Sequence, residues 1–181
     1  KNIIKSMKQK HNLVVTVQSK EMTVDLLDHY KIDYRLLGYH NKYLFGKILN
    51  LIKTTLKLCI ISHSFKPDIF ISVAGSNTSF AAKFSDSISY VLDDTDHSRV
   101  ERALYQPLAT KILTPASSDI KAGYKQIKYR SYHGLFHLHP DHFIPDDGVL
   151  EEIGFTKTSK YIILRLVSWT AYHDRNSEAK R

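Results

Sequence analysis

Residues 68–97 constrain the fold of this chain more than any other stretch. They contain a short apolar run, Ile69–Val73, a break at Gly75, a helical pattern over 78–85 and a second apolar run, Ile88–Leu92. Short apolar runs bounded by turn residues are typical of buried strands. Two such strands joined by a helix form a βαβ unit, whose strands must be parallel. The stretch therefore predicts an α/β fold.

Alternating patterns of the same kind continue on both sides of this unit. Apolar runs predict further strands at 13–17, 33–37, 111–115 and 126–130, and helical spacing predicts helices at 3–10, 43–64, 99–108, 117–123 and around 24–27, with Ser19 or Thr23 as the cap of the last. This alternation is typical of a doubly wound parallel sheet. We therefore expect a Rossmann-like domain over residues 1–143.

The remaining residues predict the beginning of a second domain over 144–181. Two prolines in the stretch 139–145 indicate a linker, and a helix at 146–153 and a strand at 160–166 follow. The chain opens inside a helical pattern and ends in a polar run. We therefore expect a piece of a longer protein, truncated at both ends, that lacks the first strand of its sheet.

Composition narrows the class of protein. The single cysteine, Cys59, excludes an intramolecular disulfide framework and favours a reducing compartment. Apolar stretches fall short of the roughly 20 residues that span a bilayer, and no signal-peptide pattern is visible, so we expect a cytoplasmic protein. The formal charge of +8 comes from Lys and Arg residues spread along the chain. Nucleic-acid binding is therefore not expected.

The helix predicted at 43–64 is both apolar and basic. Its apolar side contains Leu44, Ile48, Leu51, Ile52, Leu56, Cys59 and Ile60, and Lys42, Lys47, Lys53 and Lys57 punctuate it. A basic amphipathic helix can lie on a membrane surface, or it can pack on a sheet like any other helix. Packing on the sheet is the favoured interpretation, and peripheral membrane contact is the alternative.

An acidic cluster follows the second strand of the βαβ unit. Open α/β sheets bind ligands at the carboxyl ends of their strands, and Asp93, Asp94, Asp96 and His97 occur at that edge. Carboxylates and imidazoles can accept a proton from a hydroxyl group. Asp94 and His97 are therefore the candidate catalytic residues, and Asp96 is a candidate for substrate binding. As alternatives, Asp94 or Asp96 caps the next helix, or the cluster binds a cation.

Two other groups supply candidate substrate-binding residues. Gly75, Ser76 and Asn77 form a turn that permits close approach of a ligand, before a helix whose N–H groups can hold an anion; an ordinary capped turn is the alternative. His133 and Gly134 precede three more histidines, whose irregular spacing does not predict a zinc site. We expect no metal and no cofactor.

Several motifs occur in an order that resembles the archaeal and bacterial DUF354 family, which is related to glycosyltransferases and sugar-nucleotide epimerases of the GT-B fold. The matching stretches are Phe65-Lys-Pro-Asp68, Gly75-Ser76, Asp94-Thr-Asp-His97, Thr114-Pro115, Tyr132-His-Gly134, His139-Pro-Asp-His-Phe-Ile-Pro145 and Arg165-Leu-Val-Ser-Trp-Thr-Ala-Tyr-His-Asp174. Together they cover nearly the whole chain.

The resemblance implies two Rossmann-like lobes with a nucleotide-sugar site between them, the second lobe being mostly absent here. Arg165, Trp169 and Asp174, where that lobe begins, are further candidate substrate-binding residues: Arg165 can pair with a phosphate, and Trp169 can stack or pack. The implied function is glycosyl transfer from a nucleotide-sugar donor to an unknown acceptor, in surface-polysaccharide or glycolipid synthesis. The 181-residue chain alone is expected to be inactive.

Two alternatives remain open within this resemblance. The first is a sugar-nucleotide epimerase. Nonhydrolysing 2-epimerases carry His-Gly-Asp where this chain has Ala74-Gly75-Ser76, so one acid–base carboxylate of such an enzyme is missing. The second alternative is a noncatalytic module that binds a nucleotide or a sugar.

Overall fold

A computed structural model describes residues 1–19, 22–39, 44–96, 98–146, 148–156 and 158–164. The chain divides into two compact units, Lys1–Phe136 and His137–Arg181. The boundary between them lies a few residues before the domain boundary expected at 143.

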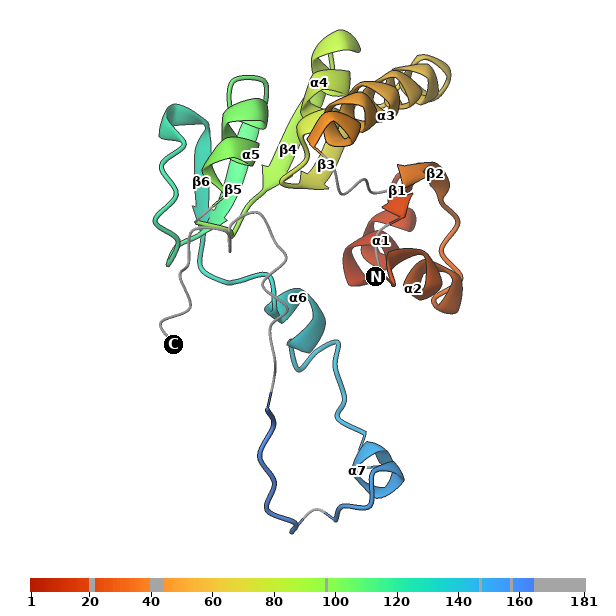
Figure 1. Ribbon diagram of the computed structural model, residues 1–181, viewed down its shortest axis with the longest axis vertical. Helices are drawn as coiled ribbons and strands as arrows, with labels where there is room; N and C mark the ends of the chain where they lie inside the picture. Colours follow the sequence, from red (N-terminus) through yellow and green to blue (C-terminus); the bar gives the residue numbers. More distant parts are fainter. Residues whose placement is uncertain (20–21, 40–43, 97, 147, 157, 165–181) are drawn as a thin grey trace. The chain divides into compact units, whose positions relative to one another are not determined.

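Two parallel sheets form the first unit (Figure 1). One contains four strands in the order β3 (Ile69–Val73), β4 (Ile88–Leu92), β5 (Lys111–Pro115) and β6 (Gln126–Tyr129), and the other contains β1 (Thr16–Ser19) and β2 (Arg35–Tyr39). Every neighbouring pair of strands is parallel. The prediction of an α/β fold with a parallel sheet is confirmed.

Helices connect these strands, as the alternating pattern predicts. The first unit contains α1 (Asn2–Lys8), α2 (Thr23–His29), α3 (Leu44–Phe65), α4 (Ser76–Phe84), α5 (Arg99–Tyr105), the 3-10 helix η1 (Gly123–Lys125) and the start of α6 (Leu135–Leu138); α7 (Gly148–Glu152) belongs to the second unit. Among the residues described, no helix combines the length and the apolar character needed to cross a membrane.

Two apolar clusters join the helices to the strands. In the first, Tyr105 of α5 packs with Val91 of β4 and Ile112 of β5, and all three are fully buried. In the second, Leu58 of α3 packs with Leu37 of β2 and with Ala81 of α4. α3 and α4 therefore connect the two-stranded sheet to the four-stranded one.

Strand pairing, rather than the apolar runs, sets the bounds of β1 and β2. The runs predict strands at 13–17 and 33–37, whereas both strands begin and end later in the chain. Gln18 pairs with Gly38 and Ser19 with Tyr39, after a bulge. These polar residues extend β1 because their backbone groups find partners. Ser19 is therefore not the cap of α2, whose N-cap is Met22.

The helix predicted over 117–123 is wrong, because side chains satisfy backbone groups in this loop. Ser118 Oγ accepts a hydrogen bond from Ile120 N at 3.2 Å. Gln126 Nε2 donates to Ile120 O at 2.7 Å, and its Oε1 accepts from Ala122 N at 3.2 Å. Side-chain bonds of this kind compete with helix formation.

The second unit contains α7, within the predicted range 146–153. The strand predicted over 160–166 is not formed by residues 160–164, and 165–166 lie outside the described residues. A strand requires a neighbour for its backbone groups, and the described part of this unit contains no other strand.

An apolar groove of about 270 Å³ separates β1 from β3. Its lining comes from α1, the segment before β1 with the first residue of that strand, α3, β3 and Thr78 of α4, and includes Ile4, Val15, Leu58 and Ile71. In their own sheets, β1 pairs with β2 and β3 pairs with β4. None of the predicted site residues lines this groove. The expected first strand of the sheet stays a prediction.

Candidate functional site

The loops that follow β3, β4, β5 and β6 lie at one edge of the four-stranded sheet. In the parallel register, Val73 pairs with Leu92, Leu92 with Leu113, and Pro115 with Tyr129. Ala74 N also donates to Leu92 O at 2.9 Å, directly before the turn at Gly75. The structure therefore places the turn after β3 and the acidic cluster after β4 at the same edge, as expected.

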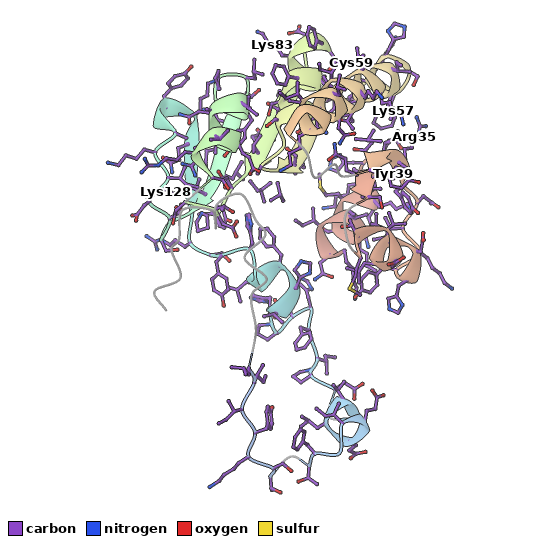
Figure 2. The ribbon with its side chains drawn as sticks, viewed as in Figure 1. Arg35, Tyr39, Lys57, Cys59, Lys83 and Lys128 are labelled. Atoms are coloured by element: carbon purple, nitrogen blue, oxygen red, sulfur yellow. The ribbon has the colours of Figure 1, made fainter. Side chains whose placement is uncertain are left out.

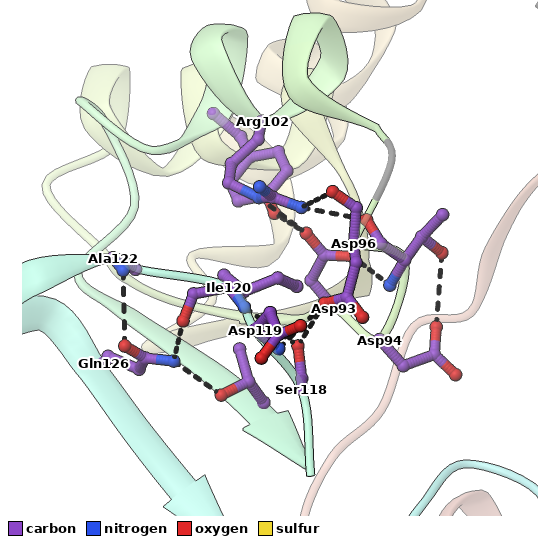
Figure 3. A network of polar contacts seen from close by, with 12 residues as sticks. Asp93, Asp94, Asp96, Arg102, Ser118, Asp119, Ile120, Ala122 and Gln126 are labelled. Carbon is purple, nitrogen blue, oxygen red and sulfur yellow. Dashed lines mark hydrogen bonds and ion pairs between the residues drawn. The ribbon is translucent and has the colours of Figure 1, made fainter. Parts of the chain in front are cut away.

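Asp93 is buried and holds the loop after β4 in place (Figure 3). Its Oδ2 accepts hydrogen bonds from Tyr105 OH and, at 3.3 Å, from Arg102 Nε. Its Oδ1 accepts from Thr95 N at 2.9 Å. With only 1% of its surface exposed, Asp93 is a structural carboxylate that faces the core rather than a ligand.

Asp96 connects the loop after β4 to the loop after β5. Its Oδ1 accepts hydrogen bonds from Ser118 Oγ at 2.6 Å and from Asp119 N at 3.1 Å. The N-cap of α5 is Ser98, without a side-chain capping bond. The alternative in which Asp94 or Asp96 caps this helix is therefore wrong. Asp96, predicted to bind substrate, thus fixes the loop after β5 to the loop after β4.

Asp94 is the carboxylate of the cluster that pairs with a histidine. Its Oδ2 lies 2.9 Å from Nδ1 of His133, in the turn after β6. The Asp94 side chain is 38% exposed and that of His133 is 17% exposed. At this distance, a proton on Nδ1 would face the carboxylate and leave Nε2 as the other ring nitrogen. Two predicted site residues from distant loops thus form one acid–base pair.

An aromatic cluster surrounds His133. Its ring is stacked with that of Tyr129, with centroids 6.4 Å apart and an interplanar angle of 11°, and it lies 5.4 Å from that of Phe136. Burial, together with the negative charge of Asp94, raises the pKa of Tyr129. His133 Nε2 and Tyr129 OH are buried and have no hydrogen-bond partner among the atoms described. Sequence reasoning missed Tyr129 and Phe136, although Tyr129 ends a strand at the carboxyl edge of the sheet.

The start of α1 contacts the same region. Asn2 Nδ2 donates a hydrogen bond at 2.9 Å to the carbonyl oxygen of Phe136. The chain segment that bears the aromatic cluster is therefore attached at both the sheet and the first helix.

Gly75 is required by packing rather than by its backbone angles. Its φ is −84°, whereas the preceding Ala74 has a φ of +46° and takes the left-handed conformation of the turn. A Cβ atom on Gly75 would overlap Thr78 Oγ1 and the Ser72 side chain. The absence of a side chain at Gly75 therefore allows close packing of the turn.

Gly75→Ala is expected to lower the free energy of unfolding by about 1–3 kcal/mol, because the new methyl group displaces packed side chains. Urea denaturation measures the change. Ala74→Gly is the matched control: it relieves the left-handed alanine while increasing the entropy of the unfolded chain, so the free energy should stay constant or rise by up to about 1 kcal/mol. Equal losses in both variants would contradict this account.

Ser76, Asn77 and Gly134, the other candidate substrate-binding residues near this edge, lie in turns or at the start of a helix. Ser76 is the first residue of α4, and Asn77 Oδ1 accepts from Thr78 N at 2.9 Å. One of the N–H groups expected to hold an anion is thus already paired. Gly134 lies in the turn before α6, where a Cβ would contact the exposed ring of Tyr132.

Four of the predicted site residues, His97, Arg165, Trp169 and Asp174, lie outside the described residues. In the described ranges, no three His, Cys, Asp or Glu side chains form a group that could hold a metal ion. His139 and Asp141 form an exposed pair, with Nδ1 and Oδ2 3.5 Å apart.

Tyr105 makes the free energy of unfolding depend on pH in the alkaline range. Burial, and then the hydrogen bond to Asp93, raise the pKa of Tyr105 above its usual value of about 10. A raised pKa in the folded state means that this contribution is complete below pH 10 and is lost as pH rises above it. Urea denaturation between pH 8 and pH 11 should therefore show a fall in the free energy of unfolding above pH 10, and Tyr105→Phe should reduce that slope. An unchanged slope in the variant would contradict the assignment.

Comparison with protein-family models, with curated proteins and with solved structures found no match for this chain.

Proposed function

We propose that this protein transfers a glycosyl group from a nucleotide-activated sugar to a hydroxyl group of an acceptor, with Asp94 and His133 as the catalytic pair. Glycosyl transfer of this kind requires a base that removes the acceptor's proton. A histidine oriented by a carboxylate is an effective form of that base. The resemblance to the DUF354 family supports the choice of a nucleotide sugar as the donor.

The proposed reaction uses the two nitrogens of His133 differently. Nε2 accepts the proton of the acceptor hydroxyl while its oxygen forms a bond to the anomeric carbon of the sugar. The bond from that carbon to the nucleoside diphosphate breaks, and the diphosphate leaves with the electron pair. Asp94 stabilises the imidazolium through Nδ1, 2.9 Å away. His133 thus replaces His97 as the partner of Asp94 in this proposal.

The observation that carries the proposal is the pairing of Asp94 with His133, whose Oδ2 and Nδ1 lie 2.9 Å apart. Nε2 of His133 is buried and has no partner among the atoms described, so the proposal requires that the neighbouring rings move to admit the acceptor hydroxyl. The site also lies at the carboxyl edge of the parallel strands, where α/β folds bind ligands. Gly75, Ser76 and Asn77 would then line the acceptor side of the same edge.

The donor side is assigned to Arg165, Trp169 and Asp174, as the resemblance implies. Reaction in the cytoplasm is part of the same proposal, and the free thiol of Cys59 favours a reducing compartment. Ser76, where 2-epimerases carry an aspartate, favours transfer over epimerisation.

A thermal-shift screen against UDP-, GDP- and dTDP-sugars tests the proposal. A ligand at 100 times its Kd stabilises the folded state by about 2.7 kcal/mol, which raises the Tm of a chain of this size by about 5–10 °C. The free sugars and the nucleoside monophosphates are the controls. No shift with any nucleotide sugar would overturn the choice of donor. A shift without turnover by the longest natural form of the protein would favour the noncatalytic module.

A further inference from the structure

The buried face of α3 coincides only in part with the apolar side that the sequence pattern indicates, since Cys59 packs on the core whereas Ile48, Ile52, Leu56 and Ile60 are exposed. Thr54, Leu58 and Ser62, spaced four residues apart, are buried. Thr54 Oγ1 donates to Asn50 O and Ser62 Oγ to Leu58 O, both at 2.7 Å. These hydroxyl groups are satisfied within the helix, so they can face the protein interior without other partners. The packed side of α3 therefore consists of Leu58, with Cys59 and Ile61 beside it, flanked by the small polar side chains of Thr54 and Ser62.

Large apolar side chains lie on the opposite side of the helix. Ile48, Ile52, Leu56 and Ile60 follow each other at intervals of four, which places them in one row. Their exposed fractions are 52%, 52%, 59% and 70%. We name these four residues the α3 row. Contiguous apolar surface of this kind on a folded domain marks an interaction site.

Positive charge borders the α3 row. Lys53 and Lys57 directly follow Ile52 and Leu56 in the sequence, so both lie on the same flank of the row, and both are exposed. Figure 2 labels Lys57 on this helix. α3 contains no aspartate or glutamate over its whole length, Leu44–Phe65. The surface around the row is therefore apolar and cationic, without any acid from the helix itself.

We propose that the α3 row docks on an anionic lipid surface. Amphipathic helices of this type place their apolar side at the boundary of headgroups and acyl chains, and each nearby lysine contributes electrostatic attraction to anionic lipids. An apolar protein partner would not require the adjacent lysines. A second copy of this chain would bring the same lysines together, which is unfavourable. The membrane site does not depend on the proposed glycosyl transfer.

Co-sedimentation of the 181-residue chain with vesicles tests the docking. Vesicles of phosphatidylcholine with 30 mol% phosphatidylglycerol should bind the protein, and pure phosphatidylcholine should bind it much less. Lys53→Gln/Lys57→Gln should reduce partitioning about 20–30-fold. Leu56→Asn/Ile60→Asn should reduce it at least about tenfold. The matched control, Lys121→Gln/Tyr124→Asn, changes exposed residues elsewhere and should stay within about twofold of the original protein.

A fluorescent label on the α3 row provides a second readout, which reports contact with the vesicle directly. Cys59 is the single cysteine, so Cys59→Ser/Ile60→Cys carries one NBD group on the row. Its emission should increase and shift to the blue on anionic vesicles, whereas a label at Tyr124→Cys in the same background should not respond. Absence of binding to anionic vesicles, or equal binding by the row variants, would overturn the proposal. Dimers that dissociate in Leu56→Asn/Ile60→Asn, without vesicle binding, would overturn it in favour of a second copy.

Discussion

Asp93→Ala is expected to lower the free energy of unfolding by about 3–5 kcal/mol, because removal of one partner leaves a buried charge uncompensated. Arg102, whose side chain is 12% exposed, loses its carboxylate partner and keeps only the bonds from Nη2 to backbone oxygens, of which that to Thr95 O is 2.8 Å long. The hydroxyl group of Tyr105 loses its acceptor. Thr95 N loses its bond at 2.9 Å as well. Since small domains are stable by only about 5–15 kcal/mol, this single substitution should remove a large part of the total. Urea denaturation monitored by circular dichroism measures it.

Asp94→Asn is the matched control, because it changes the neighbouring carboxylate in the same loop. Its side chain is partly exposed, and surface ion pairs contribute about 0–1 kcal/mol. The variant should therefore unfold within about 1 kcal/mol of the original protein. Similar losses for the two aspartates would contradict the division between a structural Asp93 and an available Asp94.

The same Asp94→Asn variant should reduce sugar transfer by about 10²–10⁴-fold in kcat, the usual contribution of acid–base catalysis. The amide no longer stabilises the imidazolium that forms when His133 accepts a proton. His133→Gln should have an equal or larger effect, because it removes the base itself. Both are measured on the longest natural form of the protein, with the donor that gives a thermal shift.

Measuring donor binding distinguishes a loss of catalysis from structural damage to the site. Each variant should keep the thermal shift with that donor, since neither residue is assigned to the donor side. The double variant should lose little more activity than His133→Gln alone, because residues that act as one unit are not additive. Full turnover by Asp94→Asn would exclude Asp94 as part of the base.

The strands of the sheet were the most predictable part of the fold. β3, β4 and β5 have the predicted bounds, because each is a continuous apolar run that ends at turn residues. α3 also has nearly its predicted length. Its packed face was not predictable, because apolar residues surround most of the helix and only tertiary contacts determine which of them become covered. Only the folded domain determines that Leu58 is buried and that Ile60 is exposed.

The candidate site was predictable in part. Ser89, Val91 and Asp93 are buried at alternate positions, but Leu92 between them is buried as well, so the pattern of the strand alone does not separate Asp93 from Asp94. The partner of Asp94, by contrast, was not predictable from the sequence. His133 follows β6, two strands away in the sheet, and only the parallel register brings its loop to Asp94. Adjacency in the sequence favoured His97 instead, which lies outside the described residues.

Among the residues that the structure describes, β3 pairs with β4 alone, and this unpaired edge bears on the aggregation of the chain. An apolar strand rich in β-branched residues whose backbone faces a groove can pair with another copy of itself during synthesis or at high concentration. Lys66 and Asp68 stand directly before Ile69–Val73. Charged residues beside such a strand act as gatekeepers that slow its stacking into fibrils. The two charges at the entrance of β3 thus protect the segment around which the rest of the sheet is built.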